Sequence, residues 1–235
     1  LGLDDTILEV NLTPNRGDCM GMLGLAREVA AITDTPFAPP PIPRVAAESS
    51  DSLPVELTPA SGCARFASRV IRGVRADAAA PLWMRERLRR AGLRPLGAIV
   101  DVTNYVMLEL GQPMHAYDLR EVAGGIVVRR ANPGETLRLL DGRDVTLDDS
   151  VLVIADRDKL LGLAGVMGGE HSGIGVGTND VVLEVAYFRP DAVAGRGRRF
   201  GLVTDASQRF ERGVDPTMQD RAIERATELL IACAG

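Results

Sequence analysis

The segment Asp101–Asp118, with the sequence DVTNYVMLELGQPMHAYD, places polar side chains in a largely apolar run. A polar group that is buried in a core needs a hydrogen-bond partner of its own, so a merely structural segment seldom carries so many. Pro113 fixes its own φ and favours an extended backbone at Gln112, which would hold the following imidazole in one direction. We therefore expect the segment to form one wall of a site. The polar side chains are Asp101, Thr103, Asn104, Tyr105, Gln112, His115 and Tyr117.

The first part of this segment is compatible with two secondary structures. Its β-branched residues suit a strand, whereas Val102, Tyr105 and Val106 fall at helical spacing. We expect a helix over Asp101–Leu110. From the local sequence alone, His115 is also compatible with the commoner role of a hydrogen-bonded core or surface histidine.

Length and composition indicate a globular protein of one large domain, or of one domain and part of another. The chain has 235 residues, of which 46% are hydrophobic. No run approaches the roughly 18 apolar residues of a membrane span, and nothing at the N-terminus is typical of a signal peptide. We expect a cytoplasmic protein that does not contact a membrane. Cys19, Cys63 and Cys233 lie far apart and indicate reduced core thiols.

Charge and motifs exclude several classes of site. A net charge of −5 argues against a protein that coats nucleic acid by bulk electrostatics, so any contact with RNA should be local. His115 and His171 are not spaced as paired metal ligands, and no CxxC or HExxH motif occurs. The glycine-rich region from Gly162 to Gly177 lacks the GxGxxG and GK[ST] patterns of nucleotide sites. We expect neither a metal centre nor a nucleotide site.

The N-terminal region predicts a scaffold element. A short strand at Leu8–Val10 and a turn at Thr13–Asp18 precede a helix that runs from Met22 through Ala30. Some twenty-five residues of this kind are too few to build a core, so we expect the chain to be a piece of a longer one. The prolines from Pro36 to Pro43 indicate a boundary. It divides the chain into a partial helical scaffold domain (1–40) and a second domain (41–235).

The second domain interleaves strands and helices irregularly, without a βαβ repeat. This order predicts an α+β fold with a central β-sandwich flanked by helices. Expected helices begin at Pro81, Pro190 and Asp205, and a last helix is capped by Asp215 with Pro216 in its first turn. The expected strands are Val55–Leu57, Arg65–Val74, Ile126–Arg130, Leu137–Leu140, Val151–Ala155 and Val181–Val185, with Asp141-Gly142 as a hairpin turn.

Together with Ala164–Gly173 (AGVMGGEHSG) and Gly201–Pro216 (GLVTDASQRFERGVDP), the segment Asp101–Asp118 resembles the β-subunit of bacterial phenylalanyl-tRNA synthetase. The resemblance runs in register along the whole chain and points to the module that edits mischarged tRNA. It implies a central β-sandwich and hydrolysis of tyrosine from tRNA specific for phenylalanine. It also implies that tRNA and the synthetase α-subunit are partners, in an α2β2 assembly. ATP and magnesium would serve the complete synthetase, whereas editing would need no cofactor.

The need for editing follows from how weakly the pocket that selects phenylalanine can discriminate against tyrosine. An apolar pocket for phenylalanine cannot strongly reject tyrosine, which adds only a hydroxyl, so a second site must remove the errors. An aminoacyl ester is already activated. A protein can hydrolyse it by orienting water and stabilising charge, without a covalent nucleophile or a metal.

The resemblance also assigns roles to residues. His115, Thr103 and Asn104 would position the water and the ester, and whether His115 also acts as a base stays open. Glu184 would accept a hydrogen bond from the phenol of tyrosine. The remaining pocket residues would be Pro113, Thr204 as lining, Ala206 as space for the ring, and Arg94, which would hold Glu184 or the RNA end.

Each assignment has a simpler alternative. Glu184 could be a strand carboxylate paired with an arginine. Thr204 could have no role beyond starting the helix that follows it. The stretch Arg196–Arg199 could be a solvated loop or a contact with the tRNA end. The chain as a whole could be a scaffold or tRNA-docking module without catalytic activity.

Overall fold

The computed structural model describes residues 4–59 and 61–235. The strands are β1 (Val55–Leu57), β2 (Cys63–Ile71), β3 (His115–Asp118), β4 (Ile126–Arg130), β5 (Thr136–Arg138), β6 (Asp144–Thr146), β7 (Leu152–Ala155), β8 (Leu160–Leu163), β9 (Met167–Gly168) and β10 (Val181–Phe188). They form a five-stranded sheet in the order β1-β4-β7-β8-β9, a three-stranded sheet in the order β2-β10-β3, and the pair β5-β6.

The helices precede, separate and follow these strands. The α-helices are α1 (Met22–Thr33), α2 (Leu82–Arg90), α3 (Ala98–Leu110), α4 (Pro190–Val193), α5 (Arg196–Arg199), α6 (Asp205–Arg212) and α7 (Gln219–Ala234), and short 3-10 helices are η1 (Gly17–Cys19), η2 (Leu119–Glu121) and η3 (Glu170–Ser172). No helix in the described residues combines the length and the apolar character that a membrane span needs.

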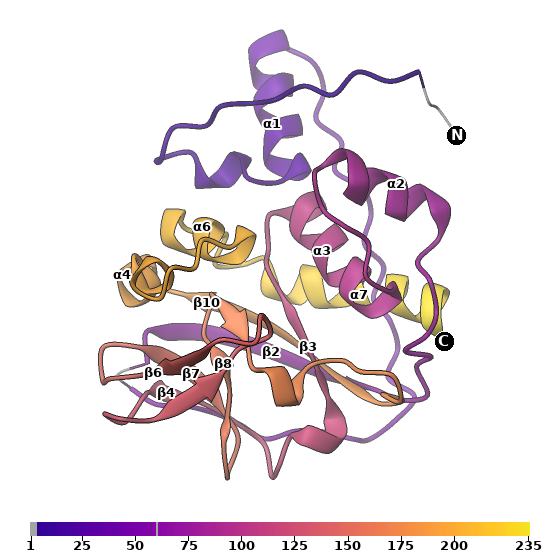
Figure 1. Cartoon of the computed structure of the whole chain (residues 1–235). Helices are drawn as coiled ribbons and strands as arrows, with labels where there is room; N and C mark the ends of the chain where they lie inside the picture. The colour runs from indigo at the N-terminus through magenta and orange to yellow at the C-terminus, as the bar shows by residue number, and fades with distance from the viewer. Residues whose placement is uncertain (1–3, 60) are drawn as a thin grey trace.

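Strand β10 separates two apolar layers, because successive side chains of a strand point to opposite faces. Val181 and Leu183 pack with residues of α3 and α7. Val182 and Ala186 pack with residues of β4, β7 and β8 from the other sheet. In Figure 1, α3 and α7 lie on one side of β10, and β4, β7 and β8 lie on the other. The fold is thus α+β, with two face-to-face sheets and helices over one of them, as the sequence predicts.

Both ends of α3 have clear causes. The helix begins at Ala98, three residues before the expected start, and Asp101 accepts a hydrogen bond from the backbone N–H of Leu96 at 2.8 Å. Gly111 ends it with φ of 75°, a left-handed conformation that glycine adopts without a steric penalty. The helix predicted for Asp101–Leu110 is confirmed.

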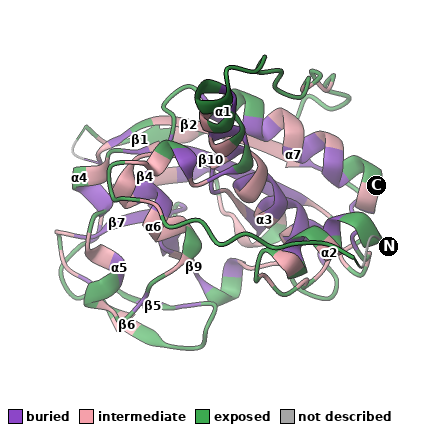
Figure 2. Cartoon of the chain, turned by 90° about the horizontal axis from the view of Figure 1, so that it is seen from above, coloured by how far each residue is buried: buried purple, intermediate pink, exposed green. Residues whose placement is uncertain are grey.

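The N-terminal region differs in part from the prediction. The helix from Met22 is confirmed as α1, but no strand forms at Leu8–Val10. Leu8 is 80% exposed and Val10 is 53% exposed, so the segment lies on no sheet that could supply backbone partners. Figure 2 shows this segment, and most of α1, in the colour of exposed residues.

Two further differences concern element boundaries and short strands. The last helix begins at Gln219 rather than after Asp215, whose carboxylate accepts from the backbone N–H of Thr217 in a separate turn. Strands β3, β6, β8 and β9 were not among the expected strands. They are two to four residues long; β3 carries a histidine and an aspartate, and β8 and β9 contain Gly162 and Gly168.

Candidate active site

The pairing of β3 with β10 brings two of the predicted site residues together. The strands are antiparallel, and His115 lies directly opposite Glu184 while Tyr117 lies opposite Val182. Glu184 shares the face of Val182 and Ala186, which points between the two sheets. His115 shares the face of Tyr117. Tyr117 packs with Val182, Ala186 and residues of β4, β7 and β8, a group that we call the inter-sheet cluster. The imidazole and the carboxylate therefore belong to one site inside the sandwich.

The carboxylate of Glu184 accepts a hydrogen bond from the side chain of a tyrosine. The hydroxyl of Tyr117 donates a short hydrogen bond to Oε2 of Glu184. Both side chains are enclosed, with Glu184 7% and Tyr117 1% exposed. Burial raises the pKa of Glu184 to about 7, and the hydrogen bond from Tyr117 acts in the opposite direction. The partner of this strand carboxylate is thus a tyrosine, and the alternative of an arginine partner is wrong.

The imidazole of His115 is held by packing. Its ring meets that of Tyr117 edge-on, with the centroids 4.6 Å apart and an interplanar angle of 73°. Its Nε2 is buried and has no hydrogen-bond partner among the described residues. Burial lowers the pKa of His115 to about 4, so the ring is neutral at neutral pH. In a neutral imidazole one nitrogen is a donor and the other an acceptor, so Nε2 is an unused hydrogen-bonding position.

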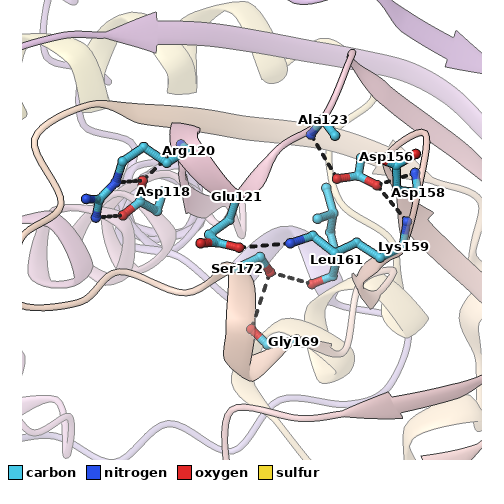
Figure 3. Close-up of polar contacts among 10 residues, drawn as sticks. All are labelled: Asp118, Arg120, Glu121, Ala123, Asp156, Asp158, Lys159, Leu161, Gly169 and Ser172. Atoms are coloured by element: carbon cyan, nitrogen blue, oxygen red, sulfur yellow. Dashed lines mark hydrogen bonds and ion pairs between the residues drawn. The ribbon is translucent and has the colours of Figure 1, made fainter.

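Gly168 of β9 packs against the imidazole of His115. A methyl group on Gly168 would lie 2.6 Å from Nε2 of His115, which is closer than a Cβ atom approaches another heavy atom in real structures. The loop after Gly168 is fixed by Ser172, whose buried hydroxyl donates to the carbonyls of Leu161 and Gly169 at 3.0 and 3.3 Å (Figure 3). The absence of a side chain at Gly168 therefore allows this segment to approach His115 closely.

The far end of β3 is anchored separately. Asp118 receives hydrogen bonds from the side chain and the backbone N–H of Arg120 and, at 2.8 Å, from the hydroxyl of Thr178. These donors lower the pKa of Asp118 to about 2. Figure 3 shows the Asp118–Arg120 pair beside the ion pair of Glu121 and Lys159. The strand that carries His115 is thus held at its C-terminal end by charge-assisted bonds.

Its N-terminal end is held by Gln112. The side-chain amide of Gln112 donates to the carbonyls of Pro113 and Ala186, and its oxygen accepts from Gln219 of α7. Pro113 itself is buried in this turn, two residues before His115. The Gln112-Pro113 step thus fixes the direction in which β3 leaves α3, as the sequence indicates.

Thr103 and Asn104 lie on α3. Thr103 is buried, and its hydroxyl donates to the backbone carbonyl of Val100 at 2.8 Å. Asn104 is half-buried. No hydrogen bond of the described structure joins either side chain to His115 or Glu184. Their placement beside the ester stays a prediction.

Thr204 and Ala206 approach the site from α6. The hydroxyl of Thr204 accepts from the backbone N–H of Ser207 at 3.0 Å and donates to the carbonyl of Val166 at 2.9 Å. Thr204 therefore starts the helix and also ties it to the loop between β8 and β9. Ala206 is half-buried and packs against the inter-sheet cluster that contains Tyr117.

The predicted arginines lie outside this interior. Arg94 is exposed in the connection between α2 and α3, and no contact of the described residues joins it to the buried Glu184. The stretch Arg196–Arg199 forms the short helix α5 rather than a loop. Arg198 and Arg199 are exposed on it, where Arg198 pairs with Glu211 at 3.2 Å and Arg199 pairs with Asp148.

Three cavities of the described structure are lined by residues other than His115, Glu184 and Ala206. The most spacious of the three, an open groove of about 600 Å³, lies between β2 and α7. Glu184 and Tyr117 are buried, whereas His115 and Ala206 are half-buried. No group of three or more histidine, cysteine, aspartate or glutamate side chains in residues 4–59 and 61–235 is arranged to hold a metal ion.

Tyr117 and Gly168 are the site residues without an assigned role in the sequence analysis. Tyr117 was recognisable as a polar group that needs a partner, but its partner lies 67 positions away. Gly168 was recognisable only as one of several glycines. Neither contact is encoded in local spacing: the first depends on the pairing of β3 with β10, and the second on the packing of β9 against β3.

Comparison with known proteins identifies the family. Residues 62–235, more than half of the chain, match the B3/4 domain model. Phenylalanine–tRNA ligase beta subunits from Dickeya dadantii, Hahella chejuensis and Methylococcus capsulatus are 54%, 56% and 57% identical over all 235 residues. The chain spans 30% of the length of each of these relatives.

A solved structure is more distantly similar. An N-terminal fragment of the phenylalanyl-tRNA synthetase beta-subunit from Pyrococcus horikoshii aligns with a TM-score of 0.44 and 14% identity, covering 74% of this chain and 53% of that one. The family model and the full-length relatives agree with the resemblance found in the sequence. The chain therefore belongs to the B3/4 domain family, in the form that occurs in phenylalanine–tRNA ligase beta subunits.

Proposed function

We propose that this chain is the editing module of a phenylalanine–tRNA ligase β-subunit and that it hydrolyses tyrosine from mischarged tRNA(Phe). One observation carries the proposal: His115 and Glu184 lie side by side on paired strands, on the faces that also carry Tyr117, Val182 and Ala186 of the apolar cluster between the sheets. An enclosed carboxylate and an imidazole nitrogen without a partner are both costly in a core. A purely structural layer has no need of them.

The chemistry requires only a positioned water. In the proposed step the water attacks the ester carbonyl, the bond to the ribose oxygen breaks, and the products are free tyrosine and tRNA with its terminal hydroxyl restored. His115, with a pKa of about 4, is a weak base. Its contribution would be to orient the water through Nε2, which supports the positioning role over strong proton abstraction.

Glu184 would supply the selectivity. Its carboxylate faces the same interior as His115 and can accept a hydrogen bond from the phenol of a tyrosyl group, which phenylalanine lacks. With a pKa of about 7, it is partly ionised at neutral pH. Ala206, half-buried at the start of α6, would leave space for the ring. The enclosure of the site implies that side chains move apart when the ester enters.

The same enclosure favours a second candidate, a scaffold or tRNA-docking module without catalytic activity. The cavities described above do not include His115, Glu184 or Ala206. In that case the Tyr117–Glu184 contact would be an internal structural bond only. The two candidates make opposite predictions for the loss of tyrosine from tRNA.

The partners are part of the same proposal, which the names of the relatives support only in general. They are tRNA(Phe) and an α-subunit, in an α2β2 assembly of the cytoplasm, with ATP and magnesium bound by other parts of the complete synthetase. The test is the rate at which the complete synthetase releases tyrosine from tyrosyl-tRNA(Phe), compared with phenylalanine from phenylalanyl-tRNA(Phe). Selective release of tyrosine supports the editing module, and equal slow loss of both esters supports the scaffold.

A further inference from the structure

We propose that Tyr117 is a positioning residue for tyrosine selection: its phenol fixes one oxygen of Glu184 and leaves the other to accept the hydroxyl of the substrate ring. This inference rests on the proposed editing function and deepens it. It concerns a residue to which the family resemblance assigned no role.

The geometry gives Tyr117 a fixed direction. Its ring is 1% exposed, is packed edge-on against His115, and belongs to the inter-sheet cluster. Its hydroxyl donates to Oε2 of Glu184. An ionised carboxylate has about four acceptor positions on two oxygens, so this bond orients the group without exhausting it. The substrate phenol would bind the acceptor positions that remain on Oε1.

The bond also affects the charge of Glu184. The titratable groups that face this carboxylate are Tyr117 and His115 from β3 and Cys63 from β2. Cys63 is a thiol whose pKa is raised to about 12 by burial and by the nearby carboxylate, and His115 is neutral. Neither supplies a positive charge. The Tyr117 hydroxyl is therefore the group that stabilises the ionised form against burial.

Removal of this hydroxyl has a defined consequence. Without its donor, the carboxyl of Glu184 should have a pKa above the value of about 7 that it has with Tyr117 in place. At neutral pH it would then be mostly protonated and a weaker acceptor for the substrate phenol. Preference for tyrosine should fall at neutral pH and return when the carboxyl ionises at alkaline pH. A merely structural role for Tyr117 would not produce such a return.

The experiment uses the complete synthetase with the substitution Tyr117→Phe, which keeps the ring and removes the hydroxyl. The release of tyrosine and of phenylalanine from tRNA(Phe) is measured from about pH 6 to about pH 9, with the uncatalysed loss subtracted. We expect the tyrosine-to-phenylalanine ratio to fall about tenfold near neutral pH, which corresponds to about one pKa unit. The ratio should recover at the alkaline end.

The matched control is Tyr105→Phe. Tyr105 is also a buried tyrosine bonded to a glutamate, since its hydroxyl donates to Glu109 at 3.1 Å and accepts from Arg87 at 2.7 Å, but it lies on α3 in the other cluster. This variant should keep the parent ratio at every pH. A second check is Tyr117→Phe in a Glu184→Gln background, where no carboxyl titrates and the pH-dependent change should vanish.

The outcomes separate this inference from the proposed function. If the parent synthetase releases tyrosine selectively but Tyr117→Phe has the parent ratio at every pH, the role of Tyr117 is overturned alone. A fall in the ratio that does not recover at alkaline pH also overturns it. If the parent synthetase shows no selective release, the proposed function is overturned, and the role of Tyr117 with it.

Discussion

The imidazole of His115 lies against the Cα of Gly168 so closely that a methyl group there would be 2.6 Å from Nε2 and 2.7 Å from Cε1. The two residues come from different sheets, His115 from β3 and Gly168 from β9. Gly168 does not have a positive φ. The requirement for glycine is therefore one of space, imposed by the histidine.

This contact predicts that Gly168→Ala displaces the imidazole and slows tyrosine release by about a hundredfold, because small misplacements of catalytic groups have effects of that size. Phenylalanine charging should be unchanged. Gly175→Ala is the matched control, since a methyl group at Gly175 meets nothing within 4 Å and the position has no positive φ. Deacylation of tyrosyl-tRNA(Phe) by both variants is the measurement, and equal rates for the two would contradict a positioned His115.

Glu184→Ala should change selectivity more than rate. It leaves the hydroxyl of the substrate tyrosine without an acceptor in the enclosed site, which costs roughly 1.5–3 kcal/mol of preference over phenylalanine. The ratio of the two deacylation rates measures it. Glu121→Ala, which breaks the ion pair with Lys159 at 2.8 Å outside the site, serves as the control. A ratio unchanged by Glu184→Ala removes this residue from tyrosine recognition.

The buried carboxyl also makes a prediction for stability. The pKa of Glu184 is raised from 4.5 to about 7, so between these values the folded state holds a proton that the unfolded state has lost. The stabilising contribution of the protonated group is complete below about pH 4.5 and is lost as the pH rises to about 7. Over that window the free energy of unfolding should fall by roughly 3 kcal/mol on account of Glu184.

Glu184→Gln removes this dependence and isolates it from that of the histidine. The lowered pKa of His115, about 4, acts with the opposite sign, because its unfolded state binds the extra proton. Chemical unfolding of the parent and the variant at about pH 5 and about pH 8 is the measurement. We expect the variant to gain stability relative to the parent as the pH rises; a constant difference would mean that Glu184 has an ordinary pKa.

Ala206→Trp tests whether Ala206 leaves space for the aromatic ring of the substrate tyrosine. Ala206 is half-buried at the start of α6, so an indole there should occupy the substrate position rather than a filled core. We expect loss of tyrosine release with a change in unfolding free energy of less than about 1.5 kcal/mol. Thermal unfolding and deacylation of the same variant are compared. A strongly destabilised protein, or a stable one that still edits, would show that Ala206 does not line the pocket.

Local patterns predicted the fold wherever the deciding forces were local. Pro81 starts α2 and Gly111 ends α3 through their own backbone preferences, and the apolar run Val181–Val185 gave β10. The expected strand at Leu8–Val10 failed because a strand needs a partner that this segment lacks. The expected start of the last helix failed because Asp215 caps a separate turn.

The candidate site was predictable only in part for the same reason. His115 and Glu184 were named from the resemblance, but their adjacency depends on the register of β3 and β10. The bond from Tyr117 to Glu184 depends on the same register, whereas the approach of Gly168 to His115 depends on how two sheets pack. Such contacts join residues far apart in the chain, and no spacing rule within one segment reports them.

The most direct measurement is made on the complete synthetase with His115→Ala. Tyrosine release from tyrosyl-tRNA(Phe) and phenylalanine charging of tRNA(Phe) are followed in parallel with the parent enzyme. We expect release to slow by about a hundredfold, the lower end of the range for a group that positions water, while charging is almost unchanged. Equal loss of both activities, or undiminished tyrosine release, would contradict an editing site at His115.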